Sequence, residues 1–199
     1  EVAGASGFAS TGLQGHYHFD GLQHRLETQA FAFAQGRYTL QAKLQAAAPM
    51  ALQASLQGQV QTPATARTSA ITLDAKAEVN GTLSGPDARL NLQAQLQPQT
   101  QPQEATHSSK PMHMKLQAQI HPWHQQALGH AQAQWQALNL AALWPGTPQT
   151  TLTGQATVTP DGTAWRAVAQ LNNQNPGPWD QKALPLSQLD VQLQSHDAQ

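Results

Sequence analysis

The sequence contains no cysteine among its 199 residues, and few of those residues are charged. Without cysteine the chain can form no disulfide bond, thiolate metal site or cysteine nucleophile. Charged residues make up 11% of the chain, against roughly 25% in ordinary soluble domains. The formal net charge is −1 and the basic residues are scattered, so we expect no binding to nucleic acid or to an anionic membrane.

Long apolar runs and catalytic motifs are also missing. No segment approaches the roughly 20 consecutive apolar residues of a membrane-spanning helix, and none has the pattern of a signal peptide. Asp74 and Glu78 would share a strand face, but about 13 Å apart, which is too far for a paired general acid and base. No serine, histidine and acid stand in a recognisable arrangement. We therefore expect no enzymatic activity, no catalytic residue and no cofactor.

Histidine is the one residue type present that suggests a metal site. His16 and His18 with nearby His24 form one group, and His121 with His124 forms another. Imidazoles bind zinc and copper, but no carboxylate or thiolate accompanies either group at ligand spacing. The chain uses glutamine and histidine as its neutral polar residues throughout. The sequence therefore favours exposed histidines over a metal site.

What the sequence has in abundance is alternation. In the segment 90–98, leucine and alanine alternate with asparagine and glutamine, which gives one apolar and one amide-rich face when the chain is extended. The pattern Leu-Gln-Ala-x-Leu recurs at 40–44, 52–56 and 92–96, and isoleucine closes a related copy at 116–120. The sequence therefore predicts repeated strands, each with an aliphatic and a neutral polar face.

This alternation predicts roughly ten antiparallel strands with very little helix. The segments expected to be extended are 15–20, 23–35, 37–45, 50–61, 71–79, 89–97, 112–121, 127–137, 151–159, 165–171 and 184–194. Asn80-Gly81 and the Gly-Pro-Asp run at 85–87 are expected to bracket a tight turn. Residues 138–144 break the alternation and predict a short helical turn. We expect one domain over residues 1–199, cut from a longer protein, with a disordered loop at about 98–111.

The aliphatic faces have two interpretations. They are the inner faces of a closed β-sandwich in a structural or adhesive module that binds through its polar surface, or they line a groove for acyl chains. The many alanines and glycines at inward positions, the few phenylalanines and the nearly uncharged outer faces favour the groove. The residues then expected to contact lipid are Leu40, Leu44, Leu52, Leu56, Ile71, Leu73, Leu90, Leu92, Leu96, Met112, Met114, Leu116, Ile120, Leu152 and Val158.

Several short runs in the second half of the chain resemble the TamB branch of the AsmA-like proteins. The resemblance is to the repetitive region of the large subunit of the translocation and assembly module. The runs are Gly-Thr-Leu-Ser-Gly at 81–85, Leu-Asn-Leu-Ala-Ala-Leu-Trp-Pro at 138–145, Leu-Thr-Gly at 152–154, Asn-Pro-Gly-Pro-Trp-Asp at 175–180 and Leu-Pro-Leu at 184–186. Residues 1–60 share only the general texture, and the glutamine-rich segment 98–111 has no counterpart in the family.

The resemblance implies both a fold and a function. Such proteins are attached to the inner membrane of Gram-negative bacteria and cross the periplasm. Their elongated antiparallel sheet folds lengthwise into a taco-like hydrophobic groove. They are implicated in phospholipid transport to the outer membrane and in outer-membrane protein assembly. The implied partners are phospholipid acyl chains and, through regions outside this fragment, the outer-membrane barrel protein of the assembly module; the family has no catalytic residues.

Overall fold

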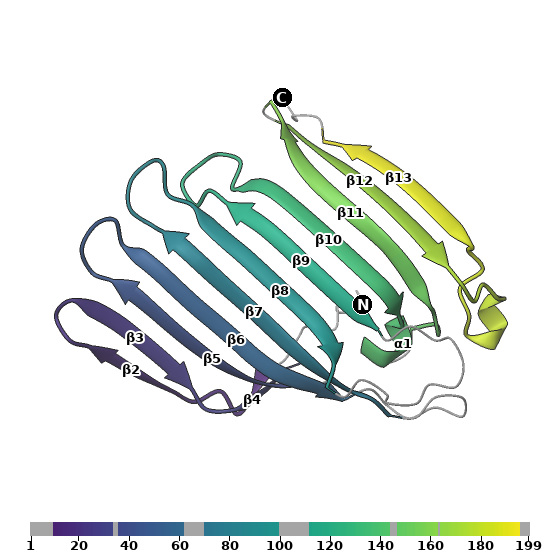
Figure 1. Cartoon of the computed structure of the whole chain (residues 1–199), viewed down its shortest axis with the longest axis horizontal. Coiled ribbons are helices and arrows are strands. Elements are labelled where there is room, and N and C mark those ends of the chain that lie inside the picture. The colour runs from purple at the N-terminus through teal and green to yellow at the C-terminus, as the bar shows by residue number, and fades with distance from the viewer. Residues whose placement is uncertain are drawn as a thin grey trace, which may run out of the picture.

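The computed structural model describes residues 10–33, 36–61, 70–99, 112–143, 147–162 and 164–195, and within them the chain is all-β (Figure 1). The strands are β1 (Ser10–Thr11), β2 (Gly15–Phe19), β3 (Gln23–Thr28), β4 (Phe31–Phe33), β5 (Gly36–Gln45), β6 (Ala51–Gln61), β7 (Thr72–Thr82), β8 (Leu90–Pro98), β9 (His113–Ile120), β10 (Leu128–Leu138), β11 (Leu152–Asp161), β12 (Ala164–Asn173) and β13 (Gln188–Gln194). The two helical segments are α1 (Leu140–Leu143) and the 3₁₀ turn η1 (Trp179–Gln181).

All thirteen strands belong to one sheet, and every neighbouring pair is antiparallel. From β5 to β13 each strand pairs with the next one along the chain, so the sheet is a long meander. Beside β5 lie β3 and β4, which pair with successive parts of it, and β2 and β1 lie outside them. The expected elongated antiparallel all-β fold is confirmed.

The sheet is open. At one end of the strand order lies β13, and at the other end lie β1, paired with β4, and β2, paired with β3. Figure 1 shows that the sheet twists but does not close on itself. Among the described strands there is no second sheet, so the alternative of a closed β-sandwich is not what these residues form. A sandwich and an open sheet share the same alternation along each strand, and for that reason the sequence alone left both open.

Three local predictions need correction. The turn that Asn80-Gly81 and residues 85–87 were expected to bracket is present, but Asn80-Gly81 lies in the strand before it, because β7 continues to Thr82 and pairs Gly81 with both Leu52 and Leu90. The turn comes later, where Gly85 has a φ of +85° that favours glycine. The expected continuous strand 23–35 is divided into β3 and β4 around Gln29–Ala30. The strands expected over 151–159 and 165–171 extend further toward each other, since Pro160 and Asp161 also lie in β11 and pair with β12.

The expected helical turn after β10 is confirmed as α1. The positive φ of Ala137 (50°) coincides with a register shift between Trp135 and Leu138, and the chain leaves the sheet there. The expected loop at 98–111 lies largely outside the described residues. Pro98 still ends β8, and the backbone N–H of Gln99 donates to the carbonyl of Thr72 at 3.0 Å.

The buried core lies at one end of the strands, which we call the helix edge. Its buried apolar members are Val60, Leu73, Leu96, Met112, Leu138 and Leu152. Leu140 and Leu143 of α1 and Leu184 pack against this cluster. Buried Thr150 holds α1 in place, since its hydroxyl donates to Leu138 O at 3.0 Å and accepts from Leu140 N at 2.9 Å. At this edge the chain therefore covers its own apolar face.

The opposite end of the strands carries the hairpin turns, and we call it the turn edge (Figure 1). Neighbouring turns are hydrogen-bonded to each other. The N–H groups of Leu83 and Ser84 donate to Met50 O and Pro49 O, both at 3.1 Å. The indole N–H of Trp123 donates to Leu83 O at 2.6 Å. These links hold the turns of separate hairpins in a fixed row.

Candidate functional site

One face of the sheet is apolar from one side of the molecule to the other. Directly paired residues lie on the same face, so the strand register traces rows across the sheet. The longest row passes through Tyr17, Leu26, Ala42, Ala54, Val79, Leu92, Ala118, Ala131, Val158, Ala167 and Leu193. A second row contains Leu40, Leu56, Ala77, Ala94, Leu116, Ala133, Ala156, Ala169 and Val191. We call this surface the aliphatic face.

The residues expected to contact lipid lie on this face or at the strand ends that continue it, but they differ in exposure. Ten are half-buried: Leu40, Leu44, Leu52, Leu56, Leu90, Leu92, Met114, Leu116, Ile120 and Val158. Ile71, just before β7, is 47% exposed. Leu73, Leu96, Met112 and Leu152 are buried in the core at the helix edge. The face is therefore covered by the chain near α1 and open toward the turns.

The opposite surface, the amide face, is polar and almost neutral. One of its rows contains Thr39, Gln57, Lys76, Gln95, Lys115, Gln134, Gln155, Gln170 and Asp190. Lys76 is paired with Glu78 on the same face at 2.9 Å. At surface exposure such an ion pair contributes little to stability. The two faces thus have very different affinities for water.

Aromatic rings lie over glycines on the aliphatic face, a feature that sequence reasoning missed. A Cβ added at Gly58 would meet the ring of Tyr38, and one added at Gly154 would lie 2.9 Å from the ring of Trp135. The glycines let these rings lie close to the sheet, and burial raises the pKa of the Tyr38 hydroxyl. The Nε1 atom of Trp135 is buried with no hydrogen-bond partner among the described residues. A glycine paired with an aromatic residue on the aliphatic face indicates this packing, but the pairing can be recognised only once the register of the strands is known.

The first histidine group does not converge. His24 lies on the aliphatic face, stacked on Phe19 with ring centroids 4.4 Å apart, and its Nδ1 is 2.6 Å from the Tyr17 hydroxyl. His16 and His18 lie on the other face, paired with Glu27 and Arg25. Within the described ranges there is no group of three or more His, Cys, Asp or Glu side chains that could hold a metal ion.

The second pair, His121 and His124, lies in the turn between β9 and β10 with ring centroids 5.0 Å apart. The ring of His124 is held by a 3.0 Å hydrogen bond between its Nε2 and Pro86 O in the neighbouring turn. Because a carbonyl only accepts, His124 Nε2 is the donor in this bond. This pair belongs to the turn edge.

Large apolar side chains are exposed at the first strands of the sheet. Tyr17 is 64% exposed, Phe19 45% and Leu22, in the turn between β2 and β3, 79%. That turn is rigid, because Asp20 accepts hydrogen bonds from the backbone N–H groups of Leu22 and Gln23 at 3.0 and 2.8 Å. The same bonds hold the pKa of the Asp20 carboxyl below its usual value. The aliphatic face thus continues, exposed, to this side of the sheet.

Comparisons with known proteins add no relative to this description. No family model, no curated protein and no solved structure matches the chain. In the part of the chain that the structure describes, no helix is both long and apolar enough to cross a membrane.

Proposed function

We propose that this chain is a segment of a periplasm-spanning bridge whose aliphatic face carries phospholipid acyl chains between the inner and outer membranes. The observation that supports the proposal best is an apolar row that runs unbroken from Tyr17 in β2 to Leu193 in β13. No second sheet among the described strands covers this face. Monomeric soluble proteins rarely leave a contiguous apolar surface of such extent uncovered.

The dimensions of the face suit an acyl chain. With strands about 4.8 Å apart, the row from β2 to β13 extends for about 45–50 Å. Each CH₂ group removed from water contributes about 0.8 kcal/mol, so a chain of many methylenes is held firmly. The rows offer mainly leucine, alanine and valine, with no charged group to hold the chain at one place. Movement along the face then exchanges one apolar contact for an equivalent one, and transport is passive, without catalysis.

The finer architecture in this proposal is a sheet that folds lengthwise into a taco-like hydrophobic groove around the aliphatic face. Small residues favour such a curl, because the second row has alanine at Ala77, Ala94, Ala133, Ala156 and Ala169. Small side chains on the inside let the two halves of a curved sheet approach without collision. The resemblance to AsmA-like proteins suggests the rest: a periplasmic location with attachment to the inner membrane, and contact with the outer-membrane barrel protein through regions outside this sequence.

The proposal predicts that lipid accompanies the protein through purification. The chain, secreted to the periplasm of a bacterial host and purified without detergent, is expected to yield at least one phospholipid per chain on solvent extraction and mass spectrometry. A secreted all-β protein of similar size with a closed core, prepared in parallel, is the control and should yield almost none. A folded, monomeric and lipid-free preparation that also takes up no added phospholipid contradicts the proposal.

A further inference from the structure

At the turn edge, the sheet opens into a cavity that none of the predicted lipid-contacting residues lines. The strands β10 and β11 pair only from Ala131 and Val158 inward, so residues 128–130 and 159–161 have no partners across this gap. Residues 159–161 pair with β12 alone. The cavity here has a volume of about 1020 Å³ and is lined by Pro86, His121, Trp123, His124, Gln125, Gln126, Leu128, Gly129, Pro160 and Gly162.

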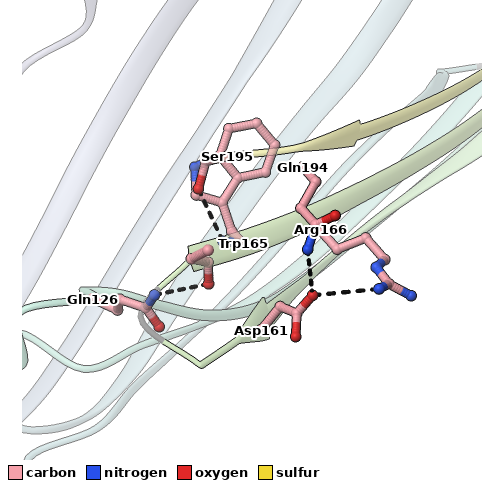
Figure 2. A network of polar contacts seen from close by, with 7 residues as sticks. Gln126, Asp161, Trp165, Arg166, Gln194 and Ser195 are labelled. Atoms are coloured by element: carbon pink, nitrogen blue, oxygen red, sulfur yellow. Dashed lines mark hydrogen bonds and ion pairs between the residues drawn. The ribbon is translucent and has the colours of Figure 1, made fainter. Parts of the chain in front are cut away.

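Side-chain hydrogen bonds to backbone carbonyls hold the walls of this cavity. Trp123 donates to Leu83 O at 2.6 Å and His124 donates to Pro86 O at 3.0 Å, which fixes the turn between β9 and β10 against its neighbour. On the other side the amide of Gln126 donates to Ala164 O at 2.7 Å, across the gap between the hairpins (Figure 2). These hydrogen bonds link the turn that lines the cavity to the neighbouring turns on both sides.

The cavity joins the two kinds of surface that a phospholipid needs. Leu128 and Pro160 continue the aliphatic face, since they pair with Ile120 and Trp165. The polar lining residues, His121, His124, Gln125 and Gln126, provide hydrogen-bond donors and acceptors. An amphipathic molecule with its chains on the aliphatic face would place its polar end here.

The lining also specifies the charge of that polar end. None of the described lining residues is Asp, Glu, Lys or Arg. The nearby carboxylate of Asp161 is already engaged on the amide face, where it accepts from Gln194 at 2.9 Å and pairs with Arg166 at 3.3 Å (Figure 2). A site without formal charge best fits a ligand whose own charges cancel. The side-chain amides of Gln125 and Gln126 can accept from an ammonium group through their oxygens and donate to phosphate through their N–H groups.

Trp123 supplies the remaining element of recognition. Its indole N–H is fixed on Leu83 O, while 64% of the residue is exposed. The face of an indole ring attracts ammonium groups. We propose that this cavity binds the zwitterionic phosphate–ammonium headgroup of a phospholipid whose chains lie on the aliphatic face, and so selects zwitterionic over anionic lipids. This inference rests on the proposed function and adds a specificity site to it.

The test is an NMR titration that follows the Trp123 indole N–H, whose signal is assigned from a Trp123→Phe variant. Four soluble probes are compared: a short-chain phosphatidylethanolamine, the short-chain phosphatidylglycerol with the same chains, the matching diacylglycerol without phosphate, and free phosphoethanolamine. We expect the phosphatidylethanolamine to shift the signal at about tenfold lower concentration than the phosphatidylglycerol, as one ammonium–indole contact allows. We expect the diacylglycerol to leave it unchanged and free phosphoethanolamine to bind more weakly than the lipid.

Matched variants complete the test. Trp123→Ala is expected to remove the preference for phosphatidylethanolamine, followed through the Gln126 side-chain amide, while His130→Gln, at an exposed position outside the cavity lining, should keep it. Equal or tighter binding of phosphatidylglycerol, a shift with diacylglycerol, or free phosphoethanolamine binding as tightly as the lipid would each overturn the headgroup site. If Leu92 and its neighbours still contact lipid in that case, only the headgroup site has failed and the proposed function stands.

Discussion

Replacing Leu92 with aspartate is expected to remove lipid from the aliphatic face, whereas replacing Gln93 with aspartate is expected to leave lipid bound. Leu92 is half-buried near the middle of the longest apolar row, between Val79 and Ala118. A carboxylate there would be taken out of water by any acyl chain that covered it, without a partner to compensate. Because that penalty is several kcal/mol, we expect at least a tenfold loss of co-purified phospholipid.

The Gln93→Asp variant is a close control, since it adds the same charge one residue away on the amide face. Gln93 pairs with Glu78 and Gln117, and is exposed. Both variants must first show wild-type far-ultraviolet circular dichroism and thermal unfolding, so that lost binding is not lost folding. Equal lipid contents in two folded variants would contradict the assignment of the aliphatic face as the binding surface.

Leu73→Ala is expected to lower the free energy of unfolding by about 2–5 kcal/mol, the range for a large-to-small change in a packed core. Leu73 is 0% exposed, the largest fully buried side chain among the described residues. It pairs with Val60 and Pro98 in the cluster that α1 covers. Truncation would leave a cavity within this cluster. Urea unfolding followed by circular dichroism measures the change.

Leu193→Ala makes the same truncation on the same face in the edge strand β13, where the side chain is 54% exposed. It should change the free energy of unfolding by no more than about 0.5–1 kcal/mol. Comparing the two variants tests whether the aliphatic face is packed at the helix edge and exposed in β13. Equal losses at Leu73 and Leu193 would mean that the aliphatic face is packed uniformly, and would count against an open lipid surface.

The face of the sheet on which each strand residue lies could be predicted from the sequence. A period of two fixes which side of an extended strand each residue occupies, so Leu92 and Gln93 were assigned correctly without any contact information. The pairing of β5 with β6 followed in the same way, because only a short segment separates the two strands. The exact place of each turn did not follow, since Asn80-Gly81 has turn chemistry yet continues the ladder with Leu52 and Leu90.

The division of the candidate site into covered and open parts could not be predicted. Leu73, Leu96 and Leu152 have the same alternating context as Leu92, but they are buried in a cluster against which residues of α1 and Leu184 pack from other parts of the chain. The cavity at the turn edge also had no sequence signal. It results from the loss of pairing beyond Ala131 and Val158, and loss of pairing is a property of two strands together.

Photo-crosslinking in cells can show whether acyl chains lie on the open aliphatic face. A photoreactive amino acid is placed singly at Leu44, Leu56, Leu116 or Ile120 on the aliphatic face, and at Gln57, Gln117 or Gln119 on the amide face. Phospholipid adducts, detected by mass spectrometry, are expected from the first set and none from the second. Adducts only to protein from the aliphatic positions of folded variants, or lipid adducts in equal yield from both faces, would contradict this placement of the acyl chains.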